Sequence, residues 1–296
     1  MNYGDILKKS YQLTKKYKIL WLLGLLIGGG SSYSGNYSFS GLGDSELGND
    51  LTNEFDFSII QDYWYIVAVL MLLVLLFVLV AAVISIMARG GLFHGVHQAQ
   101  EDKKPSFKES FYVGAGKFWR VLSIQLAMVA VIGAVICVLI IPAALLMIIP
   151  VIGWVIGGLL LIVAILLIIV LSLTFALLSN YIYCYAVIEN QTIVQSIKSG
   201  WALLKKNLGE SIIMALIIYG IGFGAALVII FSLILILAIF GGVGFLLYLA
   251  FKWIGVGIAA AIALIVLMVI GLLLRGVLNV FTYSCWVYTF KELKGK

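Results

Sequence analysis

Charged residues are scarce in this chain. Only 11% of its 296 residues are Asp, Glu, Lys or Arg, whereas 64% are hydrophobic. A soluble domain is about half apolar and about a quarter charged, so this composition excludes a water-soluble globular protein. Proline, cysteine and histidine are also rare, with three, three and two residues. Cys137, Cys184 and Cys285 lie far apart in or beside apolar runs, which excludes a disulfide framework and a cysteine metal site.

Long apolar runs dominate the chain. Several exceed the roughly 20 residues that cross a hydrocarbon core of about 30 Å. The sequence therefore predicts an all-α, polytopic transmembrane helical bundle that forms one integral membrane domain over residues 1–296. Six spans are predicted, at residues 17–31, 62–87, 119–141, 157–185, 210–239 and 255–284.

The first predicted span is the shortest. Its apolar part, Ile19 to Gly30, has 12 residues, which is about 18 Å as a helix. Either the flanking residues snorkel and the bilayer thins, or the segment is a re-entrant half-helix. A true crossing is preferred, because a re-entrant segment would put two basic flanks on opposite sides of the membrane.

The distribution of Lys and Arg predicts the orientation. The polar loop at residues 31–61 contains acidic residues and no Lys or Arg, whereas basic residues cluster at the other ends of the spans. The positive-inside rule then places the N and C termini in the cytoplasm of a multi-pass protein of the plasma membrane. The net charge of +6, gathered at span ends, favours anionic lipid headgroups over nucleic acid as partners.

Three basic amphipathic segments each run into an apolar hairpin. They begin near Asn2, Ser106 and Thr192, which are residues that cap helices, and Asp5, Glu109 and Gln195 follow three positions later as in capping boxes. We interpret each segment as a cytoplasmic interfacial helix whose apolar stripe enters the acyl boundary. The stripes comprise Tyr3, Leu7 and Tyr11; Phe107, Phe111 and Phe118; and Ile193, Ile197, Trp201, Leu204 and Leu208.

The same register suggests a threefold repeat. A small residue recurs at Ser10, Gly114 and Gly200. Basic residues that could contact lipid headgroups recur just before each hairpin, at Lys15, Lys16, Arg120, Lys205 and Lys206. The repeat units would be residues 1–101, 105–190 and 191–292. The alternative is that any cytoplasmic connector between spans tends to be basic and amphipathic.

Polar residues inside the spans form a second candidate site. Arg275 is the one charge well within an apolar run, and Asn180 and Asn279 are further polar residues near the inner boundary. An intramembrane Arg is costly and often functional. The alternative is that Arg275 snorkels as an anchor and that the amides only join helices.

Two histidines and a glutamate form the one arrangement with metal-ligand spacing. His94, His97 and Glu101 are spaced i, i+3, i+7, so one helical face could present all three to Zn²⁺. A fourth ligand is not evident, and an ordinary interfacial segment is the preferred interpretation. We therefore expect no metal, no cofactor and no enzymatic activity.

Short motifs resemble a known group of proteins. They are YGDILK at residues 3–8, LWLLG at 20–24, AVIEN at 186–190, Ser196, Gly200-Trp201 and LLKKN at 203–207. With them the chain resembles a broad, poorly characterised group of prokaryotic six-span membrane proteins. That group is similar to the membrane domain fused to some glycerophosphoryl diester phosphodiesterases. The resemblance implies a membrane module beside lipid-active or envelope proteins; it transfers no catalytic residue, because that chemistry belongs to a separate soluble barrel.

The functional prediction is a non-enzymatic, lipid-interacting scaffold or accessory module. It rests on the three basic amphipathic segments and on the lack of a recognisable catalytic motif. The alternative is a transporter or channel for a small or amphipathic solute, which would use Arg275, Asn180 and hydroxyl groups within the spans. A third hypothesis is an intramembrane enzyme that uses the two histidines. The sequence names no substrate, and membrane-protein partners or a homo-oligomer remain open.

Overall fold

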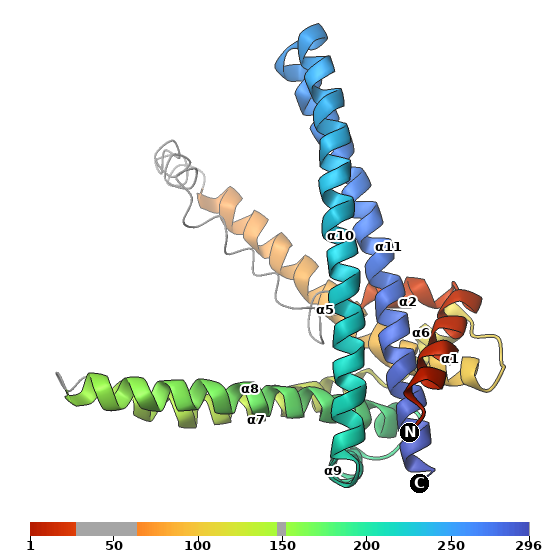
Figure 1. Ribbon diagram of the computed structural model, residues 1–296, viewed down its shortest axis with the longest axis vertical. Coiled ribbons are helices and arrows are strands. Elements are labelled where there is room, and N and C mark those ends of the chain that lie inside the picture. The colour runs from red at the N-terminus through yellow and green to blue at the C-terminus, as the bar shows by residue number, and fades with distance from the viewer. Residues whose placement is uncertain (28–63, 147–151, 296) are drawn as a thin grey trace. The chain divides into compact units, whose positions relative to one another are not determined.

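The computed structural model describes residues 1–27, 64–146 and 152–295 (Figure 1). Within these residues every regular element is an α-helix, as the sequence predicts. The helices are α1 (Tyr3–Lys16), α2 (Leu20–Leu26), α5 (Trp64–Gln100), α6 (Phe107–Gly116), α7 (Phe118–Leu146), α8 (Ile152–Val187), α9 (Ile193–Lys206), α10 (Leu208–Phe251) and α11 (Trp253–Lys294). The chain divides into two compact units, residues 28–85 and residues 1–27 with 86–296, and the packing below lies within the second.

Five helices, α5, α7, α8, α10 and α11, are long and apolar enough to cross a membrane. They coincide with the second to sixth predicted spans. The first predicted span is represented by α2 alone, which has seven residues, because residues 28–31 lie outside the described part. The polar loop predicted at 31–61 lies outside it too.

The long helices extend well past the thickness of a bilayer. α10 has 44 residues, or about 66 Å, against a hydrocarbon core of about 30 Å. In α5, α8 and α11 the run of exposed large apolar side chains ends at Val83, Leu173 and Leu274, and buried residues follow. One end of each helix is thus suited to lipid, and the other packs within protein.

The buried ends and the short helices together form what we call the head. It consists of α1, α2, α6, α9 and residues 86–100, 118–124, 175–187, 208–218 and 275–294. One continuous hydrophobic cluster fills it, with Phe93, Tyr181 and Trp286 among its largest buried side chains. The head therefore supplies the protein core that the apolar, exposed ends of the long helices lack.

Three of the short helices, α1, α6 and α9, begin where the sequence predicts. Asn2, Ser106 and Thr192 are their N-cap residues. The Asn2 side chain accepts a hydrogen bond from the Asp5 amide at 3.3 Å, which satisfies one of the unpaired amides of the first turn. Ser106 and Thr192 have extended backbones but make no side-chain cap, so the capping-box prediction is wrong for these two.

Most residues of the predicted apolar stripes face protein rather than lipid. Ile6, Leu13, Leu203 and Leu204 are all less than 9% exposed and belong to the core of the head. Of the predicted stripe residues, Tyr11, Trp201 and Leu208 are exposed. Leu204 is buried, and the following are partly buried against the same core: Tyr3, Leu7, Phe107, Phe111, Ile193 and Ile197. The prediction that the stripes enter the acyl boundary is therefore wrong for these residues, because the long helices offer them a closer apolar partner.

Glycines bring α6 and α5 into backbone contact. A Cβ atom on Gly114 would meet the Met87 carbonyl oxygen and would lie 2.6 Å from the Gly91 amide nitrogen. A Cβ atom on Gly91 would lie 2.6 Å from the Ser110 carbonyl oxygen. Neither position has room for a side chain, so the helices can pack this closely only because both residues are glycine.

The matching small residues of α9 and α1 make comparable contacts. A Cβ atom on Gly200 would lie 3.3 Å from the Ile182 amide nitrogen of α8. Ser10 of α1 is fully buried and lies beside the Cys285 thiol of α11. Each of these three helices thus packs, through its small residue, on the C-terminal part of one long helix: α6 on α5, α9 on α8, and α1 on α11.

The second short helix departs from the predicted register. α1 and α9 each have 14 residues and end in basic pairs, whereas α6 has 10 residues and ends at Gly116. Trp119 and Arg120 consequently lie in the first turn of α7. They are not structural equivalents of Lys15-Lys16 and Lys205-Lys206, because α6 is about one turn shorter.

α2 continues along α11 from the end of α1. A Cβ atom on Gly24 would collide with the Gly276 carbonyl oxygen, and one on Gly276 would lie 2.8 Å from the Trp21 carbonyl oxygen. The Asn279 amide nitrogen donates to the Gly24 carbonyl oxygen at 2.8 Å. The N-terminal residues therefore follow the C-terminal part of α11 in the antiparallel direction.

Candidate functional site

Two matching clusters on the head combine exposed lysines with an exposed aromatic ring. Lys15 and Lys16 end α1, and Tyr11, which is 61% exposed, lies one turn earlier. Lys205 and Lys206 end α9 in the same way, and Trp201, which is 51% exposed, lies one turn earlier. We call these two clusters the lysine sites. Cations at a helix C-terminus are favoured by the helix dipole. Residues four apart lie on the same helix face, so each ring lies beside a lysine.

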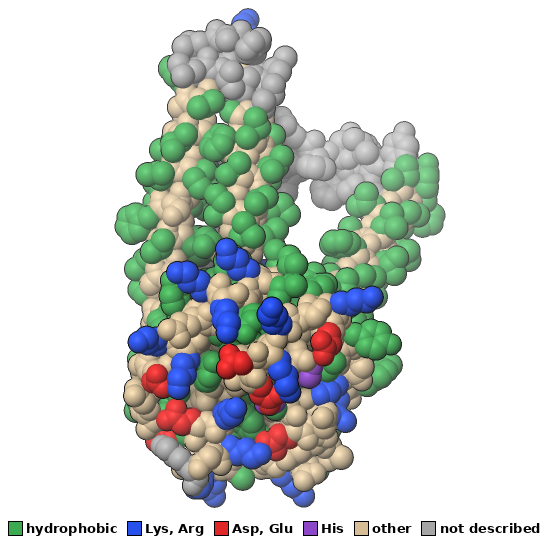
Figure 2. Space-filling view, turned by 90° about the vertical axis from the view of Figure 1, so that its right-hand side faces the viewer, with side chains coloured by type: hydrophobic (Ala, Val, Ile, Leu, Met, Phe, Trp, Pro, Cys, Tyr) green, Lys and Arg blue, Asp and Glu red, His purple; other side chains and the backbone are tan. Residues whose placement is uncertain are grey.

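Among the residues that the structure describes, nearly all charged side chains lie on or beside the head, with Lys252, between α10 and α11, as the exception. Figure 2 shows Lys, Arg, Asp and Glu over this end, while hydrophobic side chains cover the long helices. An exposed aromatic ring near lysines is the combination that suits the boundary between acyl chains and headgroups. The lysine sites are thus chemically suited to anionic headgroups.

Lys16 also contacts its own neighbours. Its ammonium lies 3.4 Å from Asp102 Oδ1 and 5.1 Å from the centre of the Tyr17 ring. The hydrogen bond with Tyr17 and the one with Asp102 raise the pKa of Lys16, so the group stays charged at neutral pH. Both the lysine and the aspartate are exposed, and a pair of this kind is weak in water.

Arg120 has a different role from the four lysines. Its guanidinium donates to the Ala186 carbonyl oxygen at 3.1 Å, and Lys117 Nζ donates to the Val187 carbonyl oxygen at 2.5 Å. These carbonyls end α8, where main-chain acceptors lack partners within the helix. Partial burial, followed by the charge of Arg120, lowers the pKa of Lys117. The two cations thus cap α8 and link it to the start of α7.

Replacing Arg120 should separate stability from lipid binding. We expect Arg120→Gln to lower the free energy of unfolding by about 1–2 kcal/mol, because it removes a charge-assisted hydrogen bond to a helix end. Anionic lipid should bind the variant with unchanged affinity. Denaturant unfolding and lipid titration of the purified variant test the two expectations. If the variant were fully stable but bound anionic lipid much more weakly, Arg120 would be a headgroup-binding residue and not a cap of α8.

The three candidates for an intramembrane polar site have separate surroundings. Asn180 is buried and donates to the Ala176 carbonyl oxygen of its own helix at 3.0 Å. Asn279 bonds to Gly24 and joins α11 to α2. Arg275 is half-buried and lies one turn before Asn279 on α11. The hydrogen bonds of the Asn180 and Asn279 side chains therefore stabilise packing within α8 and between α11 and α2.

Hydroxyl groups along the spans bond mainly to their own helices. Ser172, Thr174 and Ser179 of α8 donate to carbonyl oxygens three or four residues earlier, at 2.8–2.9 Å. Ser232 of α10 does the same at 2.8 Å. Local bonds of this type satisfy a hydroxyl without any partner across the helices. They do not favour the transporter alternative, which requires polar groups that converge.

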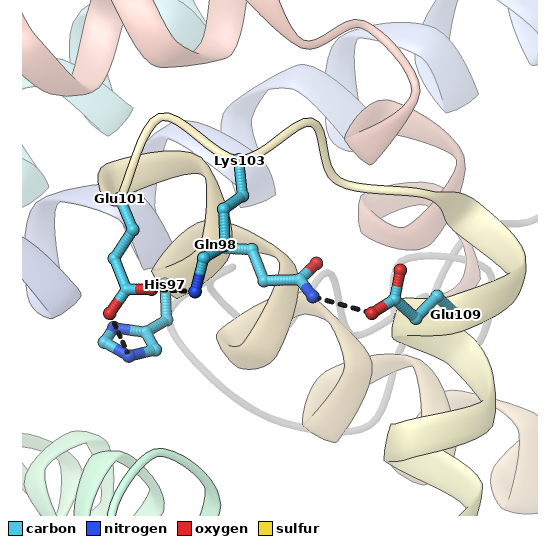
Figure 3. A network of polar contacts seen from close by, with 5 residues as sticks. All are labelled: His97, Gln98, Glu101, Lys103 and Glu109. Atoms are coloured by element: carbon cyan, nitrogen blue, oxygen red, sulfur yellow. Dashed lines mark hydrogen bonds and ion pairs between the residues drawn. The ribbon is translucent and has the colours of Figure 1, made fainter.

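The histidine segment forms a small ionic network instead of a metal centre (Figure 3). His97 Nε2 lies 3.3 Å from one Glu101 oxygen, and Lys103 Nζ lies 2.7 Å from the other. The bond from Lys103, followed by the charge of His97, lowers the pKa of Glu101. Among the residues that the structure describes, no group of three His, Cys, Asp or Glu side chains could hold a metal ion. His94 therefore does not complete a ligand set with His97 and Glu101.

Arg89 is a central residue whose burial and partners the sequence did not predict. It is 3% exposed, and its guanidinium donates to Gln125 Oε1 at 3.5 Å and lies 5.7 Å from the centre of the Tyr183 ring. The Tyr183 and Tyr283 phenol groups both interact with it. The sequence signal for this role was the position of Arg89 at the end of the apolar run, one turn before Phe93.

Beside Arg89, three aromatic rings meet. The Phe93 ring centre lies 5.9 Å from that of Tyr183 and 4.9 Å from that of Tyr283. These rings come from α5, α8 and α11, so each of the three long helices that carries a short helix contributes one ring. Offset and edge-on aromatic contacts of this kind stabilise a core, and this cluster joins three segments that are far apart in the sequence.

Over its described residues the protein is all-helical, with five helices suited to a membrane and a compact, charged head. The chain belongs to a family of unknown function, DUF7544, whose model matches residues 14–293. The match covers all five long helices and the short helices α2, α6 and α9. No curated protein and no solved structure matches the chain.

Proposed function

We propose that this protein is a non-enzymatic integral membrane protein whose head binds anionic lipid headgroups through Lys15, Lys16, Lys205 and Lys206. The observation that carries the proposal is the matching arrangement of the lysine sites at the ends of α1 and α9. In both, the lysines are exposed while the opposite face of the helix is buried in the head. The protein would act as a scaffold or accessory module for lipid-active or envelope proteins.

The charge distribution supports a location at the cytoplasmic face of the plasma membrane. Lysines near an anionic surface contribute roughly 1 kcal/mol each, so four of them give a large preference for anionic over neutral lipid. With the head in the cytoplasm, both termini lie there too, as the positive-inside rule requires.

A threefold repeat of six spans is part of the same proposal. The packing of α6 on α5, α9 on α8 and α1 on α11 supports it, as does the cluster of one ring from each of those long helices. In this arrangement the short helix of each unit packs on the last long helix of the preceding unit. The first unit packs on the third, so the order is cyclic.

Lipid titration tests the headgroup proposal. Phosphatidylglycerol added to the detergent-solubilised protein should raise its unfolding temperature more than phosphatidylcholine does, because a ligand that binds the folded state stabilises it. In the variant Lys15→Gln, Lys16→Gln, Lys205→Gln and Lys206→Gln, the apparent affinity for phosphatidylglycerol should fall by about tenfold or more.

A matched control separates the site from total charge. It replaces the exposed residues Lys8, Lys104, Lys108 and Lys198 by Gln, which removes the same number of charges from other positions on or beside the head. The control should lose less than about threefold in affinity, since the lost charges are farther from the site and screened. Equal losses in both variants would show diffuse attraction, and no loss in either would disprove the proposal.

A further inference from the structure

Arg275 lies at the point of α11 where exposed apolar residues give way to buried ones. From the start of α11 at Trp253 to Leu274, its last exposed large apolar residue, there are 22 residues, or about 33 Å of helix. α8 likewise has 22 residues from Ile152 to its last such residue, Leu173. Both lengths match a hydrocarbon core of about 30 Å. Arg275 therefore lies at the boundary between the hydrocarbon region and the phosphate layer next to the head.

Close packing of α2 fixes the backbone of α11 beside this arginine. A Cβ atom on the next residue, Gly276, would lie 2.8 Å from the Trp21 carbonyl oxygen. One turn further on, the Asn279 side chain joins the two helices by its bond to α2. The Arg275 side chain is half-buried, whereas the preceding Leu274 is 37% exposed. The guanidinium thus extends from a fixed backbone next to a surface that faces lipid.

The surrounding helices supply no counter-ion at this level of α11. Among the residues that the structure describes, no hydrogen bond or ion pair involves the Arg275 side chain. The helices that pack most on α11 are α10, α2, α1 and α8. α2 and α8 have no charged residue, α10 has only Glu210 in its first turn, and Asp5 of α1 pairs with Lys9. A cation that is partly removed from water is stabilised by a paired anion, so this anion must come from outside these helices.

The other two arginines of the chain are held by protein groups. Arg89 is 3% exposed and donates to Gln125, and Arg120 donates to the Ala186 carbonyl oxygen. A guanidinium presents a planar fork of N–H donors that matches a phosphate group with two hydrogen bonds. Arg275 is the arginine whose fork has no partner among the described residues and lies beside lipid.

We propose that Arg275 is a phosphate-binding residue, whose guanidinium binds the phosphate group of a phospholipid in the leaflet next to the head. The inference rests on the membrane location proposed above and not on the lysine sites. Those lysines attract net negative charge, whereas a guanidinium bonded to phosphate oxygens also accepts a zwitterionic lipid. The contact holds the head at a fixed depth, because it ties the boundary residue of α11 to the phosphate layer.

Solid-state nuclear magnetic resonance tests the contact directly. The full-length protein, with carbon-13 at the Cζ atom of its arginines, is placed in phosphatidylcholine vesicles in phosphate-free buffer. Hydrogen bonds between a guanidinium and phosphate are about 2.8 Å long, so the bound Cζ atom lies within about 5 Å of phosphorus. Since the chain has three arginines, lipid phosphorus should dephase about a third of the Cζ signal.

Arg275→Gln and Arg120→Gln are a matched pair, because each removes one labelled guanidinium. Arg275→Gln should abolish the dephasing, and Arg120→Gln should keep it; denaturant unfolding checks that both variants are folded. Absence of dephasing in the wild type, or dephasing that survives in Arg275→Gln, would disprove the site. Dephasing that appears only after inorganic phosphate is added would assign the anion to a soluble source and would disprove the lipid site as well.

The phosphate site and the lysine sites fail in different ways. If the Cζ signal is not dephased but the fourfold lysine variant loses affinity for phosphatidylglycerol, the Arg275 site is wrong and the headgroup proposal stands. If the signal is dephased but the lysine substitutions leave that affinity unchanged, the headgroup proposal is wrong and the Arg275 site stands.

Discussion

Gly114→Ala should destabilise the head by about 3 kcal/mol, because one added methyl group has no space at the contact between α6 and α5. The new Cβ atom would lie 2.6 Å from the Gly91 amide nitrogen and 3.0 Å from the Gly91 Cα, as well as against the Met87 carbonyl oxygen. All three are backbone atoms, so no rotamer change can relieve the clash and α6 must shift. Unfolding of the purified protein in mixed micelles with increasing dodecyl sulfate measures the loss.

Gly116→Ala is the matched control in the same helix. No atom lies within 4 Å of a Cβ atom at this position, and its φ is not positive. Alanine favours a helix over glycine by up to about 1 kcal/mol, so this variant should be as stable as the wild type or slightly more so. If both variants were equally stable, the close contact between α6 and α5 would be wrong.

Arg89→Ala should be the most damaging substitution of a charged residue, with a loss of about 3–4 kcal/mol. The change empties the volume of a side chain that is 3% exposed and removes the cation that contacts Tyr183, Tyr283 and Gln125. Arg89→Lys keeps the charge but loses the planar guanidinium, so it should fall between the wild type and Arg89→Ala. The same micellar unfolding measurement ranks the three proteins.

Arg275→Ala is the matched comparison for Arg89→Ala, because Arg275 is the charge that the sequence places well within an apolar run. Arg275 is half-buried on α11, and a partly exposed arginine can snorkel at little gain in stability. Its replacement should cost less than about 1 kcal/mol. The opposite ranking, with Arg275→Ala more damaging than Arg89→Ala, would place the important intramembrane cation on α11 and contradict the assignment made from burial.

The contrast between these arginines shows where sequence reasoning reached its limit. Arg275 stands out because apolar residues flank it for many positions. Arg89 lies where an apolar run gives way to glycines and histidines, so it resembles an ordinary residue at the end of a span. Its burial comes from Gln125, Tyr183 and Tyr283, which are between 36 and 194 positions away, and no local pattern reports such neighbours.

The short helices show a similar division. Their starts at Asn2, Ser106 and Thr192 follow from capping residues and helical periodicity, which are local properties. The C-terminal ends of the short helices are predicted less well from such local properties, since α6 ends one turn early at Gly116. The identity of the apolar partner was also undetermined, because an amphipathic stripe has the same pattern whether it covers acyl chains or a protein core.

The sequence alone determined the helical class, the position of five long apolar helices and the basic amphipathic character of the segments between them. Each of these depends on the transfer free energy and spacing of neighbouring residues, which act locally. Only the tertiary structure decided that most stripe residues cover a core, that Arg120 caps α8, that Arg89 is buried and that α1 packs on α11. Those outcomes depend on side chains and glycines from distant segments that meet only once the chain has folded.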